Sequence, residues 1–251
     1  MLIATWNVNH RFGKTRFRPE AVNAIAALQA DVVVLTEYYP RNHHIAFWAN
    51  LADAGWPYSI ASESVGDIAN RVLIASRFPL EPLAITPPTF DCEFPSNILS
   101  VTIPAARLRL VGVRIPAYES KDRSCLLASW DWLEATMAGL HDAPTVVLGD
   151  LNANPMSPPA RGGGHFRRVL AAGWRRAVPA GGASYFGHNG RRSEVDHVLC
   201  NSGCEFADVR YVIEAGGWCL AGGKGALSDH AALLADVSAT IKAGIASARP
   251  C

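Results

Sequence analysis

Two short runs of β-branched residues constrain the fold of this chain most strongly. Residues 31–37 read DVVVLTE, and residues 145–150 read TVVLGD. Continuous apolar runs of this length, rich in valine, are typical of strands that are buried on both faces of a sheet. Each run ends in a carboxylate, Glu37 in the first and Asp150 in the second. The chain is therefore expected to contain buried strands that present acidic side chains where they end.

Further strands and helices surround these two runs. Strands are expected at 2–9, 58–61, 71–76, 98–103, 108–115, 195–200, 209–213 and 231–237, and helices from Pro19, at about 44–53 and at 123–140. This mixture excludes an all-α protein, and the irregular spacing of the strands excludes a barrel of eight βα units. The pattern favours a layered, sheet-rich α/β fold, but it does not order the strands.

The loops give no sign of a domain boundary. Proline and glycine concentrate at 86–95, 155–164, 181–190 and 216–225, but none of these stretches is long enough for a linker between domains. No sequence repeat is present. A chain of 251 residues forms one large domain or two small ones by the usual size range. We therefore expect a single domain over residues 1–251, with a core at about 1–239 and a C-terminal tail at 240–251.

The composition excludes several functional classes. Apolar residues make up 49% and charged residues 18%, which excludes intrinsic disorder. Lys+Arg 23 and Asp+Glu 22 nearly balance, so no overall field attracts nucleic acid or acidic membranes. No apolar run approaches the roughly 18 residues that cross a bilayer, and the polar Asn7 interrupts the start of the chain where a signal peptide is apolar. The sequence predicts a cytoplasmic protein without a membrane partner, and no obligate protein partner is evident.

Polar side chains follow the ends of several expected strands. Such junctions are where active sites are mounted on rigid scaffolds. Carboxylate and amide oxygens suit a hard cation such as Mg²⁺ or Mn²⁺ and are a poor choice for structural zinc. With an imidazole added, they supply the parts for metal-assisted hydrolysis. The side chains concerned are Asn7, Asn9, Glu37, Asp150, Asn152, Asp196 and the pair Asp229 and His230 before the last strand.

Each of these residues has an ordinary structural explanation when it is taken alone. Asn7 alone is typical of a strand end, and Asp150 or Asp229 alone is typical of a turn. Glu37 differs, because an acid at the end of a buried strand needs a partner. It is their joint occurrence along one chain that points to a functional site.

Five segments, taken in order, carry a family resemblance: TWNVN at 5–9, LTE at 35–37, GDLNANP at 149–155, EVDHVL at 194–199 and LSDHA at 227–231. They resemble the motifs of the endonuclease/exonuclease/phosphatase superfamily. That superfamily includes DNase I-like nucleases, abasic-site endonucleases of the exonuclease III type, inositol polyphosphate 5-phosphatases and neutral sphingomyelinases. The resemblance implies a four-layer α/β/β/α sandwich, two mixed sheets packed face to face with helices outside, which agrees with the expected elements.

The resemblance also implies a site for a divalent metal. Glu37 would be the principal ligand of Mg²⁺, for which Mn²⁺ is the expected substitute. Asn7 would assist it, and Asp229 would bind the metal directly or through water. Asn9 stands where nuclease members often have an aspartate, and it completes the set of candidate ligands.

The remaining residues are assigned by resemblance to the hydrolysis of a phosphoester. Asp150 would orient or deprotonate the attacking water, and Asn152 would hold the phosphate or that water. His230 would contact the scissile phosphate, with Asp196 fixing its tautomer and raising its basicity. Either Asp150 or the Asp196–His230 pair would be the general base. His197, at a position often filled by tyrosine, is expected in the core or behind the site.

Two departures from the family pattern bear on the substrate. Arg114 stands where many relatives place histidine or tyrosine, and a guanidinium there would grip a phosphate oxygen. The alternative is an arginine on the exposed side of a strand. Ser193 and Glu194 replace the aromatic residue and the arginine that abasic-site endonucleases usually have. Their presence weakens the interpretation as a DNA-repair enzyme.

Three functions remain open for this chain. The first is a Mg²⁺-dependent phosphodiesterase that acts on DNA or RNA, favoured by the basic loop at residues 11–18, by arginines in later loops and by Trp218, which could stack on a base or close over a ligand. The second is a phosphatase or phosphodiesterase for a small or lipid-linked phosphate, favoured by the near-neutral charge. The third, an inactive relative used as a binding module, is least favoured because the metal and base residues are all present.

Overall fold

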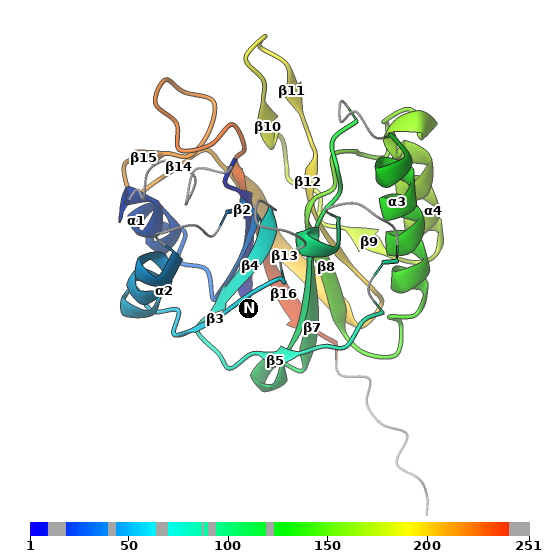
Figure 1. Cartoon of the computed structure of the whole chain (residues 1–251), viewed down its shortest axis with the longest axis horizontal. Coiled ribbons are helices and arrows are strands. Elements are labelled where there is room, and N and C mark those ends of the chain that lie inside the picture. Colours follow the sequence, from blue (N-terminus) through cyan, green and yellow to red (C-terminus); the bar gives the residue numbers. More distant parts are fainter. Residues whose placement is uncertain are drawn as a thin grey trace, which may run out of the picture.

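Two six-stranded mixed sheets pack face to face (Figure 1). The computed structural model describes residues 1–9, 19–39, 44–63, 70–86, 88–89, 94–118 and 123–240. The first sheet has the order β13 (Cys204–Val212), β16 (Ala232–Ala239), β1 (Leu2–Asn7), β2 (Val32–Tyr38), β4 (Arg71–Ser76) and β3 (Tyr58–Ala61). The second has the order β5 (Glu81–Pro82), β6 (Ile98–Ile103), β7 (Leu108–Arg114), β8 (Thr145–Asp150), β12 (Asp196–Cys200) and β9 (Arg175–Arg176).

Helices cover the outer faces of both sheets. Helices α1 (Pro19–Ala27) and α2 (His44–Asp53) lie on the first sheet, and α3 (Arg123–Ala138) and α4 (Gly163–Ala171) on the second (Figure 1). Two small ribbons stand apart, β10 (Tyr185–Phe186) with β11 (Arg192–Ser193), and β14 (Glu214–Ala215) with β15 (Trp218–Cys219). Short 3₁₀ helices occur at Phe94–Asn97, Pro104–Ala106 and Pro159–Arg161. Among the described residues, no helix is both long and apolar enough to span a bilayer.

Strand β2 shows why its sequence is apolar without interruption. Val33 and Leu35 pack outward under the helices, while Val32 and Val34 pack inward against the other sheet. Successive side chains of a strand point to opposite faces, so a strand with both faces buried needs apolar residues throughout. The sheets approach closely at Gly112, where a Cβ atom would lie 2.9 Å from Cγ1 of Val34. The predicted four-layer α/β/β/α sandwich is confirmed.

The same βαβ unit occurs once in each sheet. Strands β1 and β2 are parallel with α1 between them in the chain, and β7 and β8 are parallel with α3 between them. Parallel strands joined by a crossover have their carboxyl ends at the same edge of the sheet. Asn7 and Glu37 therefore lie at the end of the first unit, and Arg114 and Asp150 at the end of the second.

The structure corrects two expected elements. The expected loop at 155–164 ends earlier, because its last two residues, Gly163 and Gly164, begin helix α4. Glycine at 163 is explained by close packing rather than by a loop, since a Cβ there would lie 1.9 Å from the carbonyl oxygen of Ser157. Strand β13 begins at Cys204 rather than at 209, since a bulge between Ala207 and Arg210 interrupts its alternation. The predicted tail at 240–251 lies outside the described residues except for residue 240. The single domain over 1–251 stays a prediction.

Substitution of Gly149 by alanine is expected to destabilise the protein by about 3 kcal/mol or more. Gly149 has a φ of +140°, and a Cβ atom there would lie 1.9 Å from the carbonyl oxygen of Val113 on the neighbouring strand. Urea unfolding of the variant measures the effect. Gly181→Ala is the matched control, because a Cβ at Gly181 meets nothing within 4 Å. Equal stability of the two variants would contradict this account.

Candidate active site

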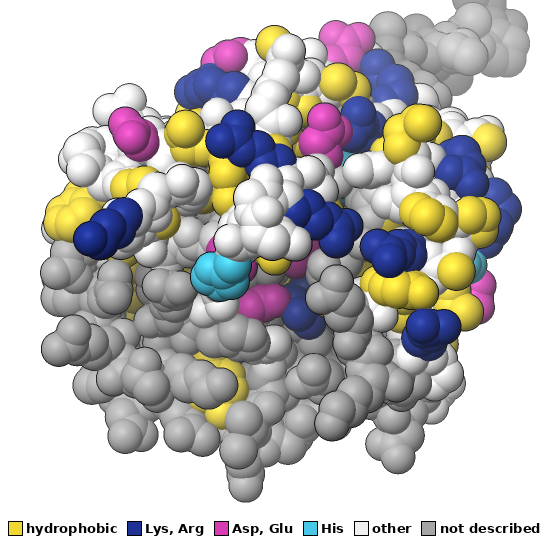
Figure 2. Space-filling view, turned by 90° about the horizontal axis from the view of Figure 1, so that it is seen from above, with side chains coloured by type: hydrophobic (Ala, Val, Ile, Leu, Met, Phe, Trp, Pro, Cys, Tyr) yellow, Lys and Arg dark blue, Asp and Glu magenta, His cyan; other side chains and the backbone are white. Residues whose placement is uncertain are grey.

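All nine residues predicted for the site converge at one edge of the sandwich, where strands of both sheets end. Seven of them line one cavity of about 570 Å³, namely Asn9, Glu37, Arg114, Asp150, Asn152, Asp229 and His230. Asn7 and Asp196 are buried directly behind it, hydrogen-bonded to Asp150 and His230 respectively. Figure 2 looks onto this side of the molecule, where basic side chains surround a small group of acidic and histidine side chains.

The backbone is strained where it delivers these side chains. Six non-glycine residues in the described part of the chain have a positive φ, and three of them belong to the site: Asn9 at 47°, Glu37 at 52° and Asn152 at 50°. Asparagine tolerates this region, whereas for glutamate it is unusual. Glu37 lies in the irregularity of β2 between Leu35 and Tyr38, and such bulges redirect a side chain. Strain of this kind is typical of functional sites.

Asp150 is the most connected carboxylate of the site. Its Oδ2 accepts hydrogen bonds from Nδ2 of Asn7 at 2.9 Å and from Nδ2 of Asn152 at 3.1 Å, and its Oδ1 accepts one from the backbone N–H of Asn152 at 3.0 Å. Nδ2 of Asn152 also donates to the carbonyl oxygen of Ile115 at 2.8 Å. Both amide hydrogens of Asn152 are therefore engaged, and its side chain can offer a ligand only the oxygen Oδ1. This oxygen accepts hydrogen bonds, so it suits a water molecule, which can donate, better than a phosphate.

Burial raises the pKa of Asp150 to about 7, and the negative charges of Asp196 and Glu37 act in the same direction. His230 and Arg114 oppose the shift. A carboxylate with a pKa near neutrality accepts a proton readily, while a substantial fraction of it is still ionised at physiological pH. Asp150 therefore has the basicity that the activation of water requires.

His230 and Asp196 form a buried pair. Nδ1 of His230 lies 2.7 Å from Oδ2 of Asp196, whose side chain is fully buried on β12. Strand β12 pairs with β8 so that Asp196 stands opposite Asp150. Burial alone would lower the pKa of His230, but the charge and hydrogen bond of Asp196, with the charges of Asp150 and Asp229, outweigh it and raise the pKa to about 10. His230 is therefore a cation at neutral pH, suited to donate rather than to accept a proton.

Two further pairs complete the site. Nε of Arg114 donates to Oε1 of Glu37 at 2.8 Å, and Nη2 of the same guanidinium lies 2.7 Å from that oxygen. Nδ2 of Asn9 donates to Oδ1 of Asp229 at 2.6 Å. Arg114 is on β7 and Glu37 on β2, so the first pair bridges the two sheets. The exposed-strand alternative for Arg114 is wrong, since only 12% of its side chain is accessible.

The donor atoms at this edge fit a divalent cation. Glu37, Asp150 and Asp229 bring carboxylate oxygens to one cavity. Asn7 and Asn9 lie beside them, with their amide nitrogens on Asp150 and Asp229, and Oδ1 of Asn7 accepts the backbone N–H of Asn9 at 2.9 Å. This all-oxygen set is what Mg²⁺ and Mn²⁺ prefer. Among the described acidic, histidine and cysteine side chains, the one group of three with ligand atoms all within 4.8 Å of one another is a different set, Asp150, Asp196 and His230. Two of those three are already joined as the His230–Asp196 pair, so this second cluster is better suited to handling a proton.

Aromatic and basic residues that the sequence did not single out line the same cavity. Tyr185 lies with its ring centroid 5.2 Å from that of His230. On another wall, Arg161 stacks on Tyr118 at 4.1 Å. Tyr118 and Tyr185 both follow apolar or glycine-rich stretches without any motif, so only the folded chain reveals them.

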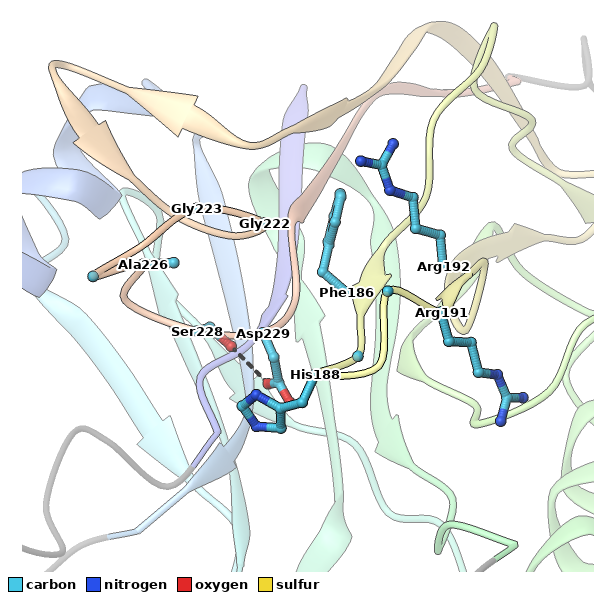
Figure 3. A pocket seen from close by; sticks show the side chains of 12 residues that line it. Phe186, His188, Arg191, Arg192, Gly222, Gly223, Ala226, Ser228 and Asp229 are labelled. Atoms are coloured by element: carbon cyan, nitrogen blue, oxygen red, sulfur yellow. Dashed lines mark hydrogen bonds between the residues drawn. The ribbon is translucent and has the colours of Figure 1, made fainter.

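A hairpin formed by β10 and β11 separates this cavity from a second one of about 400 Å³. His188, Arg191 and Asp229 line both cavities. Figure 3 shows the second cavity, with Arg191 and Arg192 extending from the hairpin in different directions. The hairpin thus places exposed arginines next to a predicted metal ligand.

Other described basic and aromatic residues that were considered for contacts with a nucleic acid do not line these two cavities. Arg168 pairs with Glu134 and Arg176 with Glu194, so these two arginines are held by carboxylates. Trp218 packs against the core under the helices of the first sheet, and it is not among the described residues that line either cavity. The basic loop at 11–18 lies outside the described residues.

His197 lies in the core, which is one of the two positions expected for it from the sequence. It is buried, its Nε2 lies 2.8 Å from the carbonyl oxygen of Ala153, and its ring meets that of Phe166 edge to face. Burial, with the positive charge of Arg176 as a smaller cause, lowers the pKa of His197 to about 3. The imidazole is therefore neutral in the folded protein.

The contribution of His197 to folding stability is expected to fall as the pH is lowered from 6.5 toward about 3. In this window the unfolded chain protonates His197 with its ordinary pKa of 6.5, whereas the folded protein does not. The contribution of His197 is therefore complete above pH 6.5 and is lost on acidification, by at most about 1.4 kcal/mol per pH unit. Urea unfolding at several pH values measures the slope. His197→Gln keeps a donor but does not titrate, so the difference in slope between the two proteins isolates His197 from Asp150, whose raised pKa acts in the opposite direction. Identical slopes would contradict the prediction.

Comparison with known proteins places the chain in a family. The model of the endonuclease/exonuclease/phosphatase family matches residues 4–230. The chain belongs to the endonuclease/exonuclease/phosphatase family. Members of this family are metal-dependent phosphoesterases. Among curated proteins, no sequence matches the chain significantly.

Solved structures of this family share the fold at low sequence identity. An AP endonuclease from Archaeoglobus fulgidus superposes with a TM-score of 0.71 at 18% identity, covering 94% of this chain and 98% of its own. The 3′ phosphatase NExo from Neisseria, bound to a product DNA hairpin, gives 0.73 at 21% identity with the same coverage, 94% and 98%. A humanised TDP2 from D. rerio gives 0.64 at 16% identity, covering 95% and 98%. At these identities the similarity concerns the fold alone.

Proposed function

We propose that the protein is a Mg²⁺-dependent phosphodiesterase that hydrolyses nucleic acid by attack of water on a phosphodiester. The observation that carries this proposal is the convergence of Asp150, the Asp196–His230 pair and oxygen donors in one cavity. Within that cavity one group is basic near neutrality and another is cationic. Groups whose pKa values are moved apart in this way are typical of a matched base and acid.

Asp150 receives the proton of the attacking water in this proposal. Asn7 and Asn152 hold its carboxylate in place, and the acceptor oxygen of Asn152 helps to orient the water. Because His230 is protonated at neutral pH, it donates to a nonbridging oxygen of the phosphate, where negative charge grows in the transition state. Asp196 is a positioning residue that holds His230 in this state.

Glu37, Asn7, Asn9 and Asp229 are the residues that would hold the metal. When bound, Mg²⁺ supplies electrostatic stabilisation of the charge that develops on the phosphate oxygens. Arg114 reaches the same cavity, and its planar guanidinium suits two oxygens of a phosphate.

A polymeric substrate is supported by the basic residues at the rim. Arg161 and Arg191 line different walls of the cavity, and Arg192 extends this basic surface into the neighbouring one. Side chains placed outside the reacting centre match the phosphates that flank a scissile bond in a strand. The Neisseria relative holds a DNA hairpin in its structure, which agrees with a substrate of this class.

A turnover screen tests this function. Wild-type protein is offered plasmid DNA, an abasic-site duplex, single-stranded RNA, bis-p-nitrophenyl phosphate and inositol polyphosphates, with Mg²⁺, Mn²⁺ or EDTA. Glu37→Ala and His230→Ala serve as inactive controls. Cleavage of a polynucleotide that requires metal and is lost in both variants supports the proposal.

The other outcomes of the screen point elsewhere. Release of phosphate from a small substrate alone would assign the protein to the second candidate function, a phosphatase for a small or lipid-linked phosphate. No turnover of any substrate, together with measurable metal binding, would leave the inactive binding module.

A further inference from the structure

The contact between Arg114 and Glu37 is unusual for a carboxylate assigned to a metal. Both guanidinium donors, Nε at 2.8 Å and Nη2 at 2.7 Å, approach the single oxygen Oε1 of Glu37. Each side chain is only 12% accessible, so water screens the pair weakly. In this structure the guanidinium of Arg114 therefore occupies Oε1 of Glu37, the principal candidate metal ligand.

The fold holds the two partners together from opposite sides. Arg114 is the last residue of β7 and stands opposite Asp150 in the parallel ladder with β8. Glu37 approaches from the other sheet, and its positive φ of 52° at the β2 bulge directs its carboxylate across the cavity. The contact is consequently built by the backbone of both sheets.

The charge balance of the site explains why a cation is needed there. Four carboxylates, Glu37, Asp150, Asp196 and Asp229, gather around the cavity. Among the described side chains that line it, His230 and Arg114 are the cations nearest to them. A buried charge without a partner strongly destabilises a folded protein, so Arg114 stabilises the site while no metal is bound.

A divalent metal and a guanidinium cannot share this carboxylate without repulsion. Like charges a few ångströms apart in a weakly screened site repel strongly. A guanidinium that leaves Glu37 keeps five donors and no acceptor, which suit the oxygens of another anion. A phosphate in the same cavity is such an anion.

We propose that Arg114 competes with the divalent metal for Glu37 and transfers to the substrate phosphate when the metal binds. Arg114 thus couples the two binding events, so that phosphate tightens metal binding and metal tightens phosphate binding. The inference rests on the proposed function, since it assumes that Glu37 is a metal ligand. It goes further by giving Arg114 a role in the metal-free protein.

The test measures Mn²⁺ binding directly, by titration calorimetry and by the paramagnetic resonance signal of free Mn²⁺, with no substrate present. Arg114→Met, which keeps the apolar stem and removes the charge, is expected to bind Mn²⁺ about tenfold more tightly than wild type. Arg114→Lys keeps the charge and should stay within about threefold of wild type. Arg109→Met is the matched control, because Arg109 lies on the same strand but pairs with Asp142, 2.6 Å away.

The second measurement repeats the titration with inorganic phosphate. Phosphate should tighten Mn²⁺ binding in wild type, and this effect should shrink in Arg114→Met. Thermal unfolding supplies a check on folding: in EDTA the Met variant should melt below wild type, and Mn²⁺ should raise its melting temperature by more. If the Met variant does not fold, Arg114→Gln, which can donate to Glu37 without a charge, replaces it.

The outcomes separate this inference from the function on which it rests. Mn²⁺ binding that is weakened by Glu37→Gln but not tightened by Arg114→Met overturns the inference and leaves the metal site in place. Mn²⁺ binding that Glu37→Gln does not change overturns both, because the metal is then held elsewhere. Tighter binding in Arg109→Met to the same extent as in Arg114→Met also overturns the inference, because the effect would then be one of overall charge.

Discussion

Asparagine in place of Asp150 is expected to lower kcat by about 10³-fold or more without unfolding the protein. The substitution keeps the size of the side chain but removes the carboxylate that we propose takes the proton of the attacking water. It also sets an amide beside Nδ2 of Asn7 and Nδ2 of Asn152, which both donate to the carboxylate now. Steady-state kinetics on the best substrate of the turnover screen measure the loss, and circular dichroism checks the fold.

The pH profile of kcat/KM adds a second readout for Asp150. Burial raises the pKa of this carboxyl to about 7 in the metal-free protein, and the cation that activity requires lowers it. Wild-type activity should therefore decline on acidification, with the limb below pH 7. Asp142→Asn is the matched control, since Asp142 is an exposed carboxylate that pairs with Arg109 and is not among the residues that line the cavity. An Asp150→Asn enzyme that retains more than about a tenth of wild-type kcat would show that another group activates the water.

Loss of His230 is expected to lower kcat by about 10²- to 10⁴-fold. Alanine at this position removes the imidazolium that we propose contacts the phosphate, and it leaves Asp196 buried without its partner. Asp196→Asn should act in the same direction, because the pKa of His230 then loses the charge that raises it. Single-turnover rates of the three proteins, measured at saturating substrate, give the comparison.

The choice of substrate separates two roles for His230. If it stabilises the charge on the phosphate, the loss in His230→Ala should be similar for a nucleic acid and for bis-p-nitrophenyl phosphate. A loss that disappears with the p-nitrophenolate leaving group would instead indicate protonation of the leaving oxygen. His165→Gln is the control, since His165 also pairs with a carboxylate, Glu134 at 3.1 Å, but lies on α4.

Local patterns predicted most of the scaffold and of the site. Strands such as 31–37 have both faces buried, and that requirement is visible as an unbroken apolar run with a polar residue at its end. The parallel arrangement of these strands brings their ends together, so residues predicted at separate strand ends lie next to one another in the structure.

The parts that the sequence did not reveal depend on distant or unusual backbone geometry. The contact between Glu37 and Arg114 arises from a bulge and a positive φ, neither of which has a sequence signature for glutamate. Helix α4 was missed because it begins with two glycines, and close packing requires the first of them, Gly163. Tyr118 and Tyr185 reach the cavity only through the path of their loops.

The pairing of β1 with β16 has a consequence for the biosynthesis of the enzyme. β1 is an interior strand, yet one of its two neighbours is made from residues 232–239, more than two hundred positions later in the chain. The same late segment brings Asp229 to Asn9 and His230 to the indole of Trp6. A chain still on the ribosome consequently exposes one edge of β1 and holds an incomplete site. Activity can begin only after this last strand has emerged and paired, so the chain stays inactive until its synthesis is nearly complete.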